Sequence, residues 1–336
     1  MTIGRRGFGA LAGAGLAVRG AHAASESNEL RISYLEGFGF LPNVVAERRK
    51  LIEKHAAALG LPDVKVSWQL LRSAIVATDA MLAGKLDLIC GTTTSLLVLW
   101  DKTNGGVKAL VCLGGQHLTL VTRNPNVKTV GDFGPGDRIA VPSVKQGPHS
   151  VMLGIALEKQ LGEGAWNKLD SIQVQMGHND ALLNVLNPMS EVNSHFSTLP
   201  YVDAELAATN VKAHKVIDII DIVGGPVTTL AVYGQTRWAT ENPLKAKAVV
   251  AAIDEANDLI VRDTKGVAAD YLAVTGEKFE VGQLAEMISR KGNLYASTPV
   301  RTDVYAKQMY KTGLIKKLPA SWKDYHSSLL HDRVGS

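Results

Sequence analysis

Hydroxyl-bearing residues after a short apolar run are the clearest candidates for binding chemistry in this chain. Thr92, Thr93 and Thr94, with Ser95 behind them, follow the apolar run Leu86 to Cys90 after a single glycine. One hydroxyl suffices to cap a helix that begins there, and the others could donate hydrogen bonds to an anion. We therefore expect these threonines to contact a ligand, with capping alone as the alternative. Thr93→Ala is then expected to weaken binding with little loss of stability.

A second candidate loop leads into a proline. Ser143, Lys145 and Gln146 precede Gly147-Pro148. Gly147 can cap a helix that has Pro148 in its first turn, which leaves unpaired backbone N–H groups and the positive end of the helix dipole at this loop. Lys145 and Gln146 would flank that position, so the loop predicts an anion site. A merely well-capped helix is the alternative.

Three other loops supply further candidates: Gly37 with Phe38, then Arg72, then the run Ser194, His195 and Phe196. Glycine lets the backbone approach a ligand closely, and phenylalanine offers an apolar wall or a stacking surface. Arginine pairs with a sulfonate or carboxylate through two hydrogen bonds, and histidine can donate to an oxygen. The structural alternatives are a tight turn with a core phenylalanine, a solvated arginine, and a core histidine satisfied by the backbone.

The chain lacks the sequence patterns of common catalytic and metal sites. It has no GxSxG turn, no P-loop, no HExxH and no CxxC pair, and its nine histidines show no i, i+4 pairing. Acidic residues are scattered rather than paired in the loops after predicted strands, which leaves general acid–base catalysis without a site. We therefore expect a protein that is not an enzyme and that uses neither a metal nor a cofactor.

The elements that must position these loops alternate between short apolar runs and longer amphipathic runs, which is typical of an α/β fold with doubly wound sheets. One series precedes Gly114-Gly115, and a second, ending in a short strand at 192–193, precedes Gly224-Gly225. Apolar runs beside both glycine pairs predict two strands that cross between two sheets. We expect lobe I to comprise 29–118 and 227–336 and lobe II to comprise 119–226, with a ligand cleft between them.

The first 23 residues are predicted to direct export. Arg5-Arg6 precede Phe8 and a Gly- and Ala-rich apolar run, and Ala21-His22-Ala23 matches an A-x-A cleavage site. This combination is typical of a twin-arginine signal peptide, and a disordered cytosolic leader is the alternative. We expect cleavage near Ala23 and a soluble product in the periplasm.

The chain after the signal is nearly neutral, because residues 1 to 23 hold three arginines and no acid, and the whole chain has 36 basic and 32 acidic residues. This balance gives no argument for nucleic acid or an anionic membrane as a partner. Cys90 and Cys112 each lie in an apolar run. We expect two buried free thiols, with a disulfide as the alternative that an exported protein permits.

Several segments occur in an order and spacing that characterise one protein family. They are Asp79 to Asp87 (DAMLAGKLD), Val130 to Phe133 (VGDF) with Arg138 to Pro142 (RIAVP), and Asn242-Pro243 before an Ala- and Val-rich run. With these segments, the chain resembles the extracytoplasmic substrate-binding proteins of ABC importers, in the nitrate, sulfonate and taurine group. The resemblance covers roughly residues 29 to 325.

This resemblance implies a two-lobed periplasmic-binding-protein fold of type II. It also implies a monomer that captures a small polar or anionic solute, such as a sulfonate, taurine or nitrate, and presents it to an ABC permease with its ATPase. One alternative is a ligand sensor for a membrane receptor. Another is a pyrimidine-precursor binder or a synthase-like enzyme on the same fold, although the synthase relatives are cytosolic and carry a cysteine-rich iron motif that is absent here.

Overall fold

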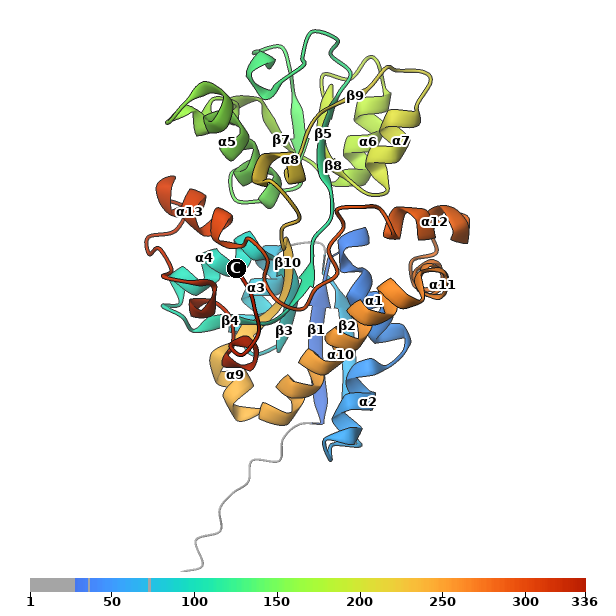
Figure 1. Ribbon diagram of the computed structural model, residues 1–336, viewed down its shortest axis with the longest axis vertical. Coiled ribbons are helices and arrows are strands. Elements are labelled where there is room, and N and C mark those ends of the chain that lie inside the picture. Colours follow the sequence, from blue (N-terminus) through green and yellow to red (C-terminus); the bar gives the residue numbers. More distant parts are fainter. Residues whose placement is uncertain (1–27, 36, 72–73) are drawn as a thin grey trace, which may run out of the picture.

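Two five-stranded sheets form the framework of the protein in a computed structural model that describes residues 28–35, 37–71 and 74–336. Each sheet is the centre of one lobe, with helices on both of its faces, and the two lobes stack end to end (Figure 1). The expected α/β fold with two sheets is confirmed. The predicted signal peptide and Arg72 lie outside the described residues, so what was expected of them stays a prediction.

The sheet of lobe I has the strand order β2-β1-β3-β10-β4. These strands are β1 (Glu29–Tyr34), β2 (Lys65–Leu70), β3 (Leu88–Thr92), β4 (Val107–Gly114) and β10 (Leu230–Gln235). β1 runs parallel to β2 and β3, so the carboxyl ends of these three strands meet at one edge. β10 runs antiparallel to β3 and β4. The central strands are almost wholly buried, because a sheet covered on both faces leaves little strand surface to water.

The sheet of lobe II has the order β7-β6-β8-β5-β9. Its strands are β5 (Leu118–Thr122), β6 (Ile139–Val141), β7 (Gln173–Gln175), β8 (Ser194–Thr198) and β9 (His214–Asp218). β6 is parallel to β7 and β8, whereas β5 is antiparallel to β8 and β9. Each sheet therefore contains a strand that crosses from the other lobe and runs against its neighbours.

Helices cover the faces of both sheets. In lobe I they are α1 (Leu41–Arg48), α2 (Leu51–Ala58), α3 (Ala74–Leu82), α4 (Thr93–Lys102), α9 (Thr236–Glu241), α10 (Pro243–Arg262), α11 (Thr264–Thr275) and α12 (Val281–Ile288). In lobe II they are α5 (Pro148–Leu161), α6 (His178–Leu186), α7 (Tyr201–Ala207) and α8 (Ile219–Val223). α6 and α7 lie on one face of the lobe II sheet, and α5 and α8 on the other (Figure 1). α13 (Asp303–Lys311) packs against both α4 and α5, and so touches both lobes.

Within the described ranges, two segments cross from one lobe to the other, as the sequence predicts: the connection from β4 to β5 and that from α8 to β10 (Figure 1). A third segment, residues 289–302 between α12 and α13, runs alongside them on the lobe I side. Gly115 N donates to Leu294 O at 2.9 Å, and Leu294 N donates to Gly115 O at 2.7 Å. Thr229 N donates to Gly114 O at 2.9 Å. The hinge is therefore a hydrogen-bonded bundle of three segments around the Gly114-Gly115 pair.

The predicted short strand at 192–193 is wrong, because β8 covers Ser194–Thr198 instead. All five residues of β8 are buried although three of them carry hydroxyls. Ser194 Oγ donates to Thr122 Oγ1 on the neighbouring strand at 2.7 Å. Buried polar residues that are satisfied in this way do not produce the apolar run from which a strand is recognised.

Cys90 and Cys112 are free and buried, which confirms the expectation of two buried thiols. Burial raises the pKa of both thiols, so neither is a reactive thiolate at neutral pH. In the part of the chain that the structure describes, no helix is long and apolar enough to span a membrane.

Candidate ligand site between the lobes

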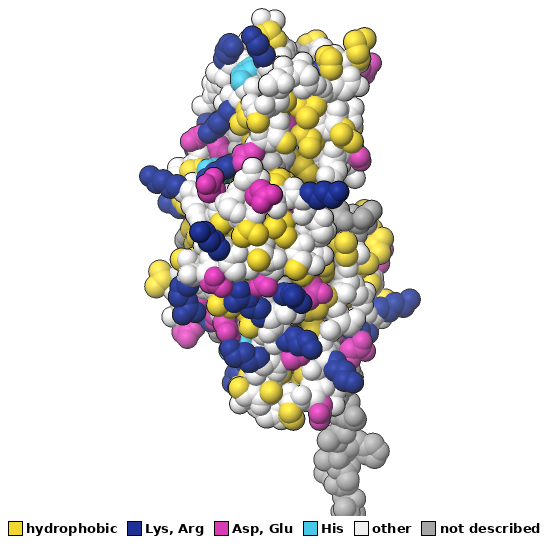
Figure 2. All heavy atoms as spheres, turned by 90° about the vertical axis from the view of Figure 1, so that its right-hand side faces the viewer, with side chains coloured by type: hydrophobic (Ala, Val, Ile, Leu, Met, Phe, Trp, Pro, Cys, Tyr) yellow, Lys and Arg dark blue, Asp and Glu magenta, His cyan; other side chains and the backbone are white. Residues whose placement is uncertain are grey.

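A cavity of about 530 Å³ lies between the two lobes, beside the carboxyl ends of β1 and β2. Lobe I contributes these strand ends, the start of α1 and the chain around the end of α11, and lobe II contributes the first turns of α6 and α7. Figure 2 shows this side of the molecule, with hydrophobic side chains gathered where the lobes meet and charged side chains around them. The volume is in the range typical of sites for small organic molecules.

The described residues that line the cavity are mostly aliphatic or aromatic. From lobe I they are Tyr34, Leu35, Gly37, Phe40, Val44, Leu70, Tyr271, Val274, Thr275, Glu277, Lys278 and Phe279, and from lobe II they are Asn179, Leu182, Pro200, Tyr201 and Ala204. A molecule that fills the cavity therefore contacts both lobes. Movement of one lobe against the other would change the size of the site.

Three tyrosines of this lining are each held by another ring. The pairs are Tyr34 with Trp68, Tyr271 with Phe38, and Tyr201 with His178, with ring centroids 6.1, 5.6 and 5.5 Å apart. The first two pairs meet edge to face, and the third is stacked with 19° between the ring planes. Because a supporting ring restricts side-chain rotation, the aromatic walls of the cavity are preformed.

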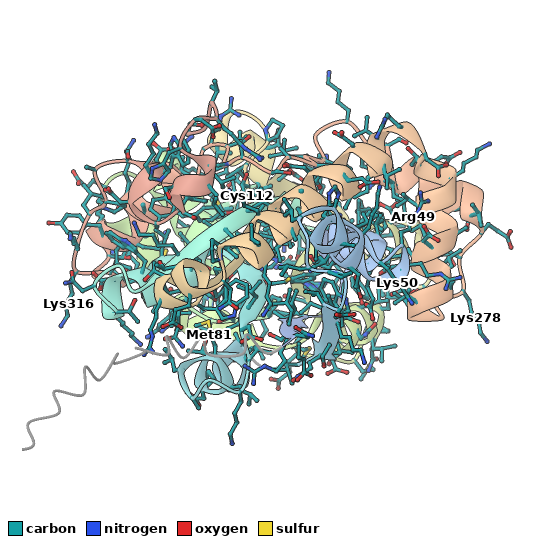
Figure 3. The ribbon with its side chains drawn as sticks, turned by 90° about the horizontal axis from the view of Figure 1, so that it is seen from below. Arg49, Lys50, Met81, Cys112, Lys278 and Lys316 are labelled. Carbon is teal, nitrogen blue, oxygen red and sulfur yellow. The ribbon has the colours of Figure 1, made fainter. Side chains whose placement is uncertain are left out.

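Few described charged groups reach the cavity. Tyr271 Oη donates to Glu277 Oε1 at 3.1 Å, so this carboxylate is engaged by the wall itself. Lys278 lies at the edge of the molecule, and its side chain points outward, away from the protein (Figure 3). Asn179 and Thr275 add uncharged polar groups. The described lining thus combines apolar surface with hydrogen-bonding groups that include three tyrosine hydroxyls, Asn179 and Thr275, a mixture that is usual in small-molecule sites.

Among the residues predicted to bind a ligand, Gly37 lines the cavity. Its φ of 129° is readily adopted only by glycine. The following turn directs Phe38 inward, where it is fully buried and packs on Tyr271. Phe38 therefore supports the cavity wall from behind. This is the core position that was considered from the sequence as the alternative to ligand contact.

The threonine run caps α4 and lies away from the cavity lining. Thr92 Oγ1 accepts a hydrogen bond from Ser95 N at 3.2 Å, and Thr94 is fully buried. Thr93 is 2% exposed, and its Oγ1 donates to Thr228 O at 3.1 Å. Removing this hydroxyl would leave a buried carbonyl without that partner, so the expectation that Thr93→Ala spares stability does not fit the structure.

The loop before α5 has the cap that the sequence predicts. Gly147 is the N-cap, Pro148 lies in the first turn, and no side chain caps the helix. Lys145 has a φ of 67°, a left-handed conformation that is uncommon for lysine. Ser143, Lys145, Gln146 and Gly147 are not part of the cavity lining. Contact between this loop and a ligand therefore stays a prediction.

Ser194, His195 and Phe196 belong to β8 and are fully buried. None of the three lines the cavity. The position of His195 matches the alternative considered from the sequence, a histidine in the core. The hydrogen-bond partner of His195, however, is a carboxyl group and not the backbone.

A buried hydrogen-bonded chain of one carboxyl group and two imidazoles stands behind the lobe II wall. Glu205 Oε1 lies 2.5 Å from His195 Nδ1, and His195 Nε2 lies 2.8 Å from His178 Nδ1. Burial raises the pKa of Glu205 to about 8 and lowers the pKa of His195 to about 3. Burial, followed by the repulsion that a protonated His195 would exert, also lowers the pKa of His178 to about 3.

At neutral pH these three groups are therefore uncharged. Protonated Glu205 can donate to His195, which can donate in turn to His178, so the chain is satisfied without a buried charge. The His178 ring then stacks on Tyr201 at the cavity wall. The chain thus fixes the orientation of an aromatic wall residue.

His149, in the first turn of α5, completes this imidazole cluster. Its ring meets those of His178 and Phe196 edge to face, and the residue is 6% exposed. Burial, followed by the charges of His178 and His195, lowers the pKa of His149 well below its ordinary value. Among the described residues, no group of three or more His, Cys, Asp or Glu side chains is placed to hold a metal ion.

Polar contacts join the lobes beside the cavity. Arg290 follows α12, and its guanidinium donates to both carboxylate oxygens of Asp203 in α7 at 2.8 and 2.6 Å. His117, between β4 and β5, lies 3.0 Å from Asp218 Oδ2 and 2.8 Å from Lys291 O. Although burial opposes ionisation, the hydrogen bond from His117 helps to hold the pKa of Asp218 below its usual range. Separation of the lobes would break the Arg290–Asp203 ion pair.

The aromatic walls are the part of the site that the sequence analysis missed. Tyr201 lies three residues beyond the end of β8, the strand whose position was mispredicted. Correct bounds for β8 would have drawn attention to it, because ligands bind beyond the carboxyl ends of strands. Tyr271 lies in α11 and Phe279 in the loop between α11 and α12, and neither segment carries a local signal of a binding role. Tyr34, the last residue of β1, could have been found from the end of its strand.

The protein has two sheets, strands that cross between them and a cavity at the junction. This architecture defines the two-lobed periplasmic-binding-protein fold. Solved structures with the fold cover most of the chain. The alkanesulfonate-binding protein SsuA from Xanthomonas axonopodis pv. citri, bound to MOPS, matches with a TM-score of 0.67 and 16% identity over 88% of this chain and 96% of its own. The periplasmic aliphatic sulphonate-binding protein SsuA from Escherichia coli matches with a TM-score of 0.65 and 19% identity, over 86% and 94%.

The periplasmic nitrate-binding protein NrtA from Synechocystis PCC 6803 also matches, with a TM-score of 0.63 and 16% identity over 92% of this chain and 86% of its own. No protein-family profile matches the chain, and no curated protein matches it in sequence. The structural likeness confirms the fold that the sequence resemblance implied. The neighbours include sulfonate- and nitrate-binding proteins, the group named from the sequence.

Proposed function

We propose that this protein is an extracytoplasmic solute-binding protein that captures a small polar or anionic molecule of the sulfonate, taurine or nitrate kind between its lobes. The observation that carries the proposal is the cavity of about 530 Å³, which both lobes line at the strand-end edge of the lobe I sheet. In this type of fold, ligands bind where strand-end loops face each other.

Capture and release follow from the way the lobes are joined. When the lobes close around a solute, the solute contacts lobe I on one side and lobe II on the other. When the lobes open, contacts such as the Arg290–Asp203 ion pair break. The hinge segments around Gly114-Gly115 keep the lobes connected during this movement. The closed form would then present its solute to an ABC permease driven by a separate ATPase.

The comparisons support a binding role rather than catalysis, because the neighbours described above are binding proteins. The predicted twin-arginine signal and the periplasmic neighbours support a periplasmic location. We propose that the protein acts as a monomer, since it must dock on the permease and leave again. Ser143, Lys145 and Gln146 stay candidates for ligand contact in this proposal.

A thermal-shift screen tests the proposal. Protein from residue 24 onward is unfolded and refolded to remove carried ligand, then heated with sulfonates, taurine, nitrate, bicarbonate, carboxylates or pyrimidines. A ligand at 100 times its Kd should add about 2.7 kcal/mol to the free energy of unfolding, a shift of several degrees. We expect one chemical class to give this shift. The absence of a shift with every class, in protein whose circular dichroism shows that it has refolded, would contradict the proposal.

A further inference from the structure

The size of the cavity is the first indication of what it holds. An inorganic anion such as nitrate occupies a space comparable with one or two water molecules, each about 30 Å³ in the liquid. A cavity of about 530 Å³ would leave most of its apolar lining uncovered around such an ion. Sites of this size ordinarily enclose an organic molecule with a ring or chain.

The preformed walls are the second indication. Tyr34 and Tyr271 come from lobe I and Tyr201 from lobe II, so aromatic residues line the cavity from both sides, although Tyr271 is only 2% exposed. Each is backed by another ring, and the stack behind Tyr201 is extended by the His178–His195–Glu205 chain. Rigid aromatic surfaces lose little side-chain entropy when a flat apolar molecule packs between them.

The described lining is poorly suited to a small, highly charged solute. Glu277 is engaged by Tyr271, and the Lys278 side chain points outward at the edge of the protein. Asn179 is a polar group at the start of α6 and can orient a head group. An ion without an apolar part would meet mainly uncharged polar groups in the described lining and would leave its aromatic surface uncovered.

We propose that the solute has an aromatic body, which packs between Tyr201 and the lobe I tyrosines, and a single small polar head group such as a sulfonate or carboxylate. This inference rests on the proposed function, and it assigns the cavity to aromatic organic solutes rather than to nitrate or taurine. Aromatic packing supplies most of the affinity, and the head group sets the orientation.

Titration calorimetry on the refolded protein from residue 24 onward tests the inference with matched compounds. Naphthalene-2-sulfonate and naphthalene-2-carboxylate are compared with methanesulfonate, taurine and nitrate. We expect both ring compounds to bind at least ten-fold more tightly than any of the three small compounds, and the two ring compounds separate the contribution of the head group from that of the ring.

Variants then locate the ring. Tyr201→Leu keeps an apolar side chain but removes the stacking surface, and should weaken naphthalene-2-sulfonate binding roughly five- to ten-fold. Tyr310→Leu is the matched control, because Tyr310 is 47% exposed on α13 and lies outside the cavity lining. If Tyr201→Leu does not fold, Ala204→Trp at the exposed rim should weaken binding of the ring compounds by filling the cavity.

The outcomes separate this inference from the proposed function. Nitrate, taurine or methanesulfonate binding as tightly as the ring compounds would overturn the inference and leave the solute-binding role standing. Unchanged affinity for naphthalene-2-sulfonate in a folded Tyr201→Leu or Ala204→Trp protein would also overturn it. If none of the five compounds bound, the inference would fail, and the broader screen would then decide the proposed function.

Discussion

Gly114→Ala is expected to lower the free energy of unfolding by more than about 4 kcal/mol, enough to prevent folding in many proteins. Gly114 has a φ of 105°, which a residue with a Cβ rarely adopts, and a Cβ there would overlap the carbonyl oxygen of Leu294. Relief of that overlap would push apart segments joined by the Gly115–Leu294 hydrogen bonds. Urea denaturation followed by circular dichroism measures the effect.

Gly134→Ala is the matched control for this prediction. A Cβ on Gly134 meets no atom within 4 Å, so the same chemical change should leave stability nearly unaltered. If Gly114→Ala unfolded at the same urea concentration as the unsubstituted protein, the close approach of the three hinge segments would be contradicted.

The second large effect concerns the buried Glu205 and the pH dependence of stability. In the folded protein Glu205 keeps its proton up to a pKa of about 8, whereas the unfolded chain releases it near 4.5. The stability linked to this group is therefore complete below about pH 4.5 and is lost as the pH rises through 8. Glu205→Gln removes the titration and keeps a donor for His195 Nδ1.

Between pH 5 and pH 8, the free energy of unfolding of the unsubstituted protein should therefore fall relative to that of Glu205→Gln, by on the order of 3 kcal/mol. The histidines act in the opposite direction. The pKa of His178 and that of His195 are lowered to about 3, so their contribution is present above about pH 6.5 and is lost as the pH falls towards 3. Because both proteins keep these histidines, their effect largely cancels in the comparison.

Chemical denaturation at pH 5, 6.5 and 8 gives the required free energies. Glu191→Gln changes an exposed carboxylate in the same lobe, and should follow the unsubstituted protein at every pH. A Glu205→Gln profile parallel to that of the unsubstituted protein would mean that Glu205 is ionised in the folded state and paired with a protonated His195. That result would contradict the neutral chain.

Much of the fold could be predicted because its signals are local. The alternation of apolar runs with amphipathic ones predicts the two sheets, and the apolar surroundings of Cys90 and Cys112 predict buried thiols. The cap of α5 at Gly147-Pro148 was also readable, since it depends on adjacent residues. β8 was misplaced because its polar residues are satisfied by partners on other elements, which a local pattern does not reveal.

The site was predicted less well, because it depends on which distant segments meet. Gly37 follows the first strand and does line the cavity, as the strand-end rule implies. The walls, however, depend on α11 of lobe I and α7 of lobe II lining the same cavity, and on Phe38 turning inward to support Tyr271. Threonines that looked like anion ligands instead cap α4 and hold Thr228, a residue 135 positions away from Thr93. Contacts between such distant residues leave no repeating pattern in the sequence from which they could be predicted.

The central claim, that a solute binds between the lobes and contacts both, is tested most directly by hydrogen exchange with and without the ligand that the thermal screen identifies. The account predicts slower exchange on binding in segments of both lobes: 34–40 and 271–279 in lobe I, and 179–182 and 200–204 in lobe II. Protection confined to one lobe, or found only away from these four segments, would contradict it.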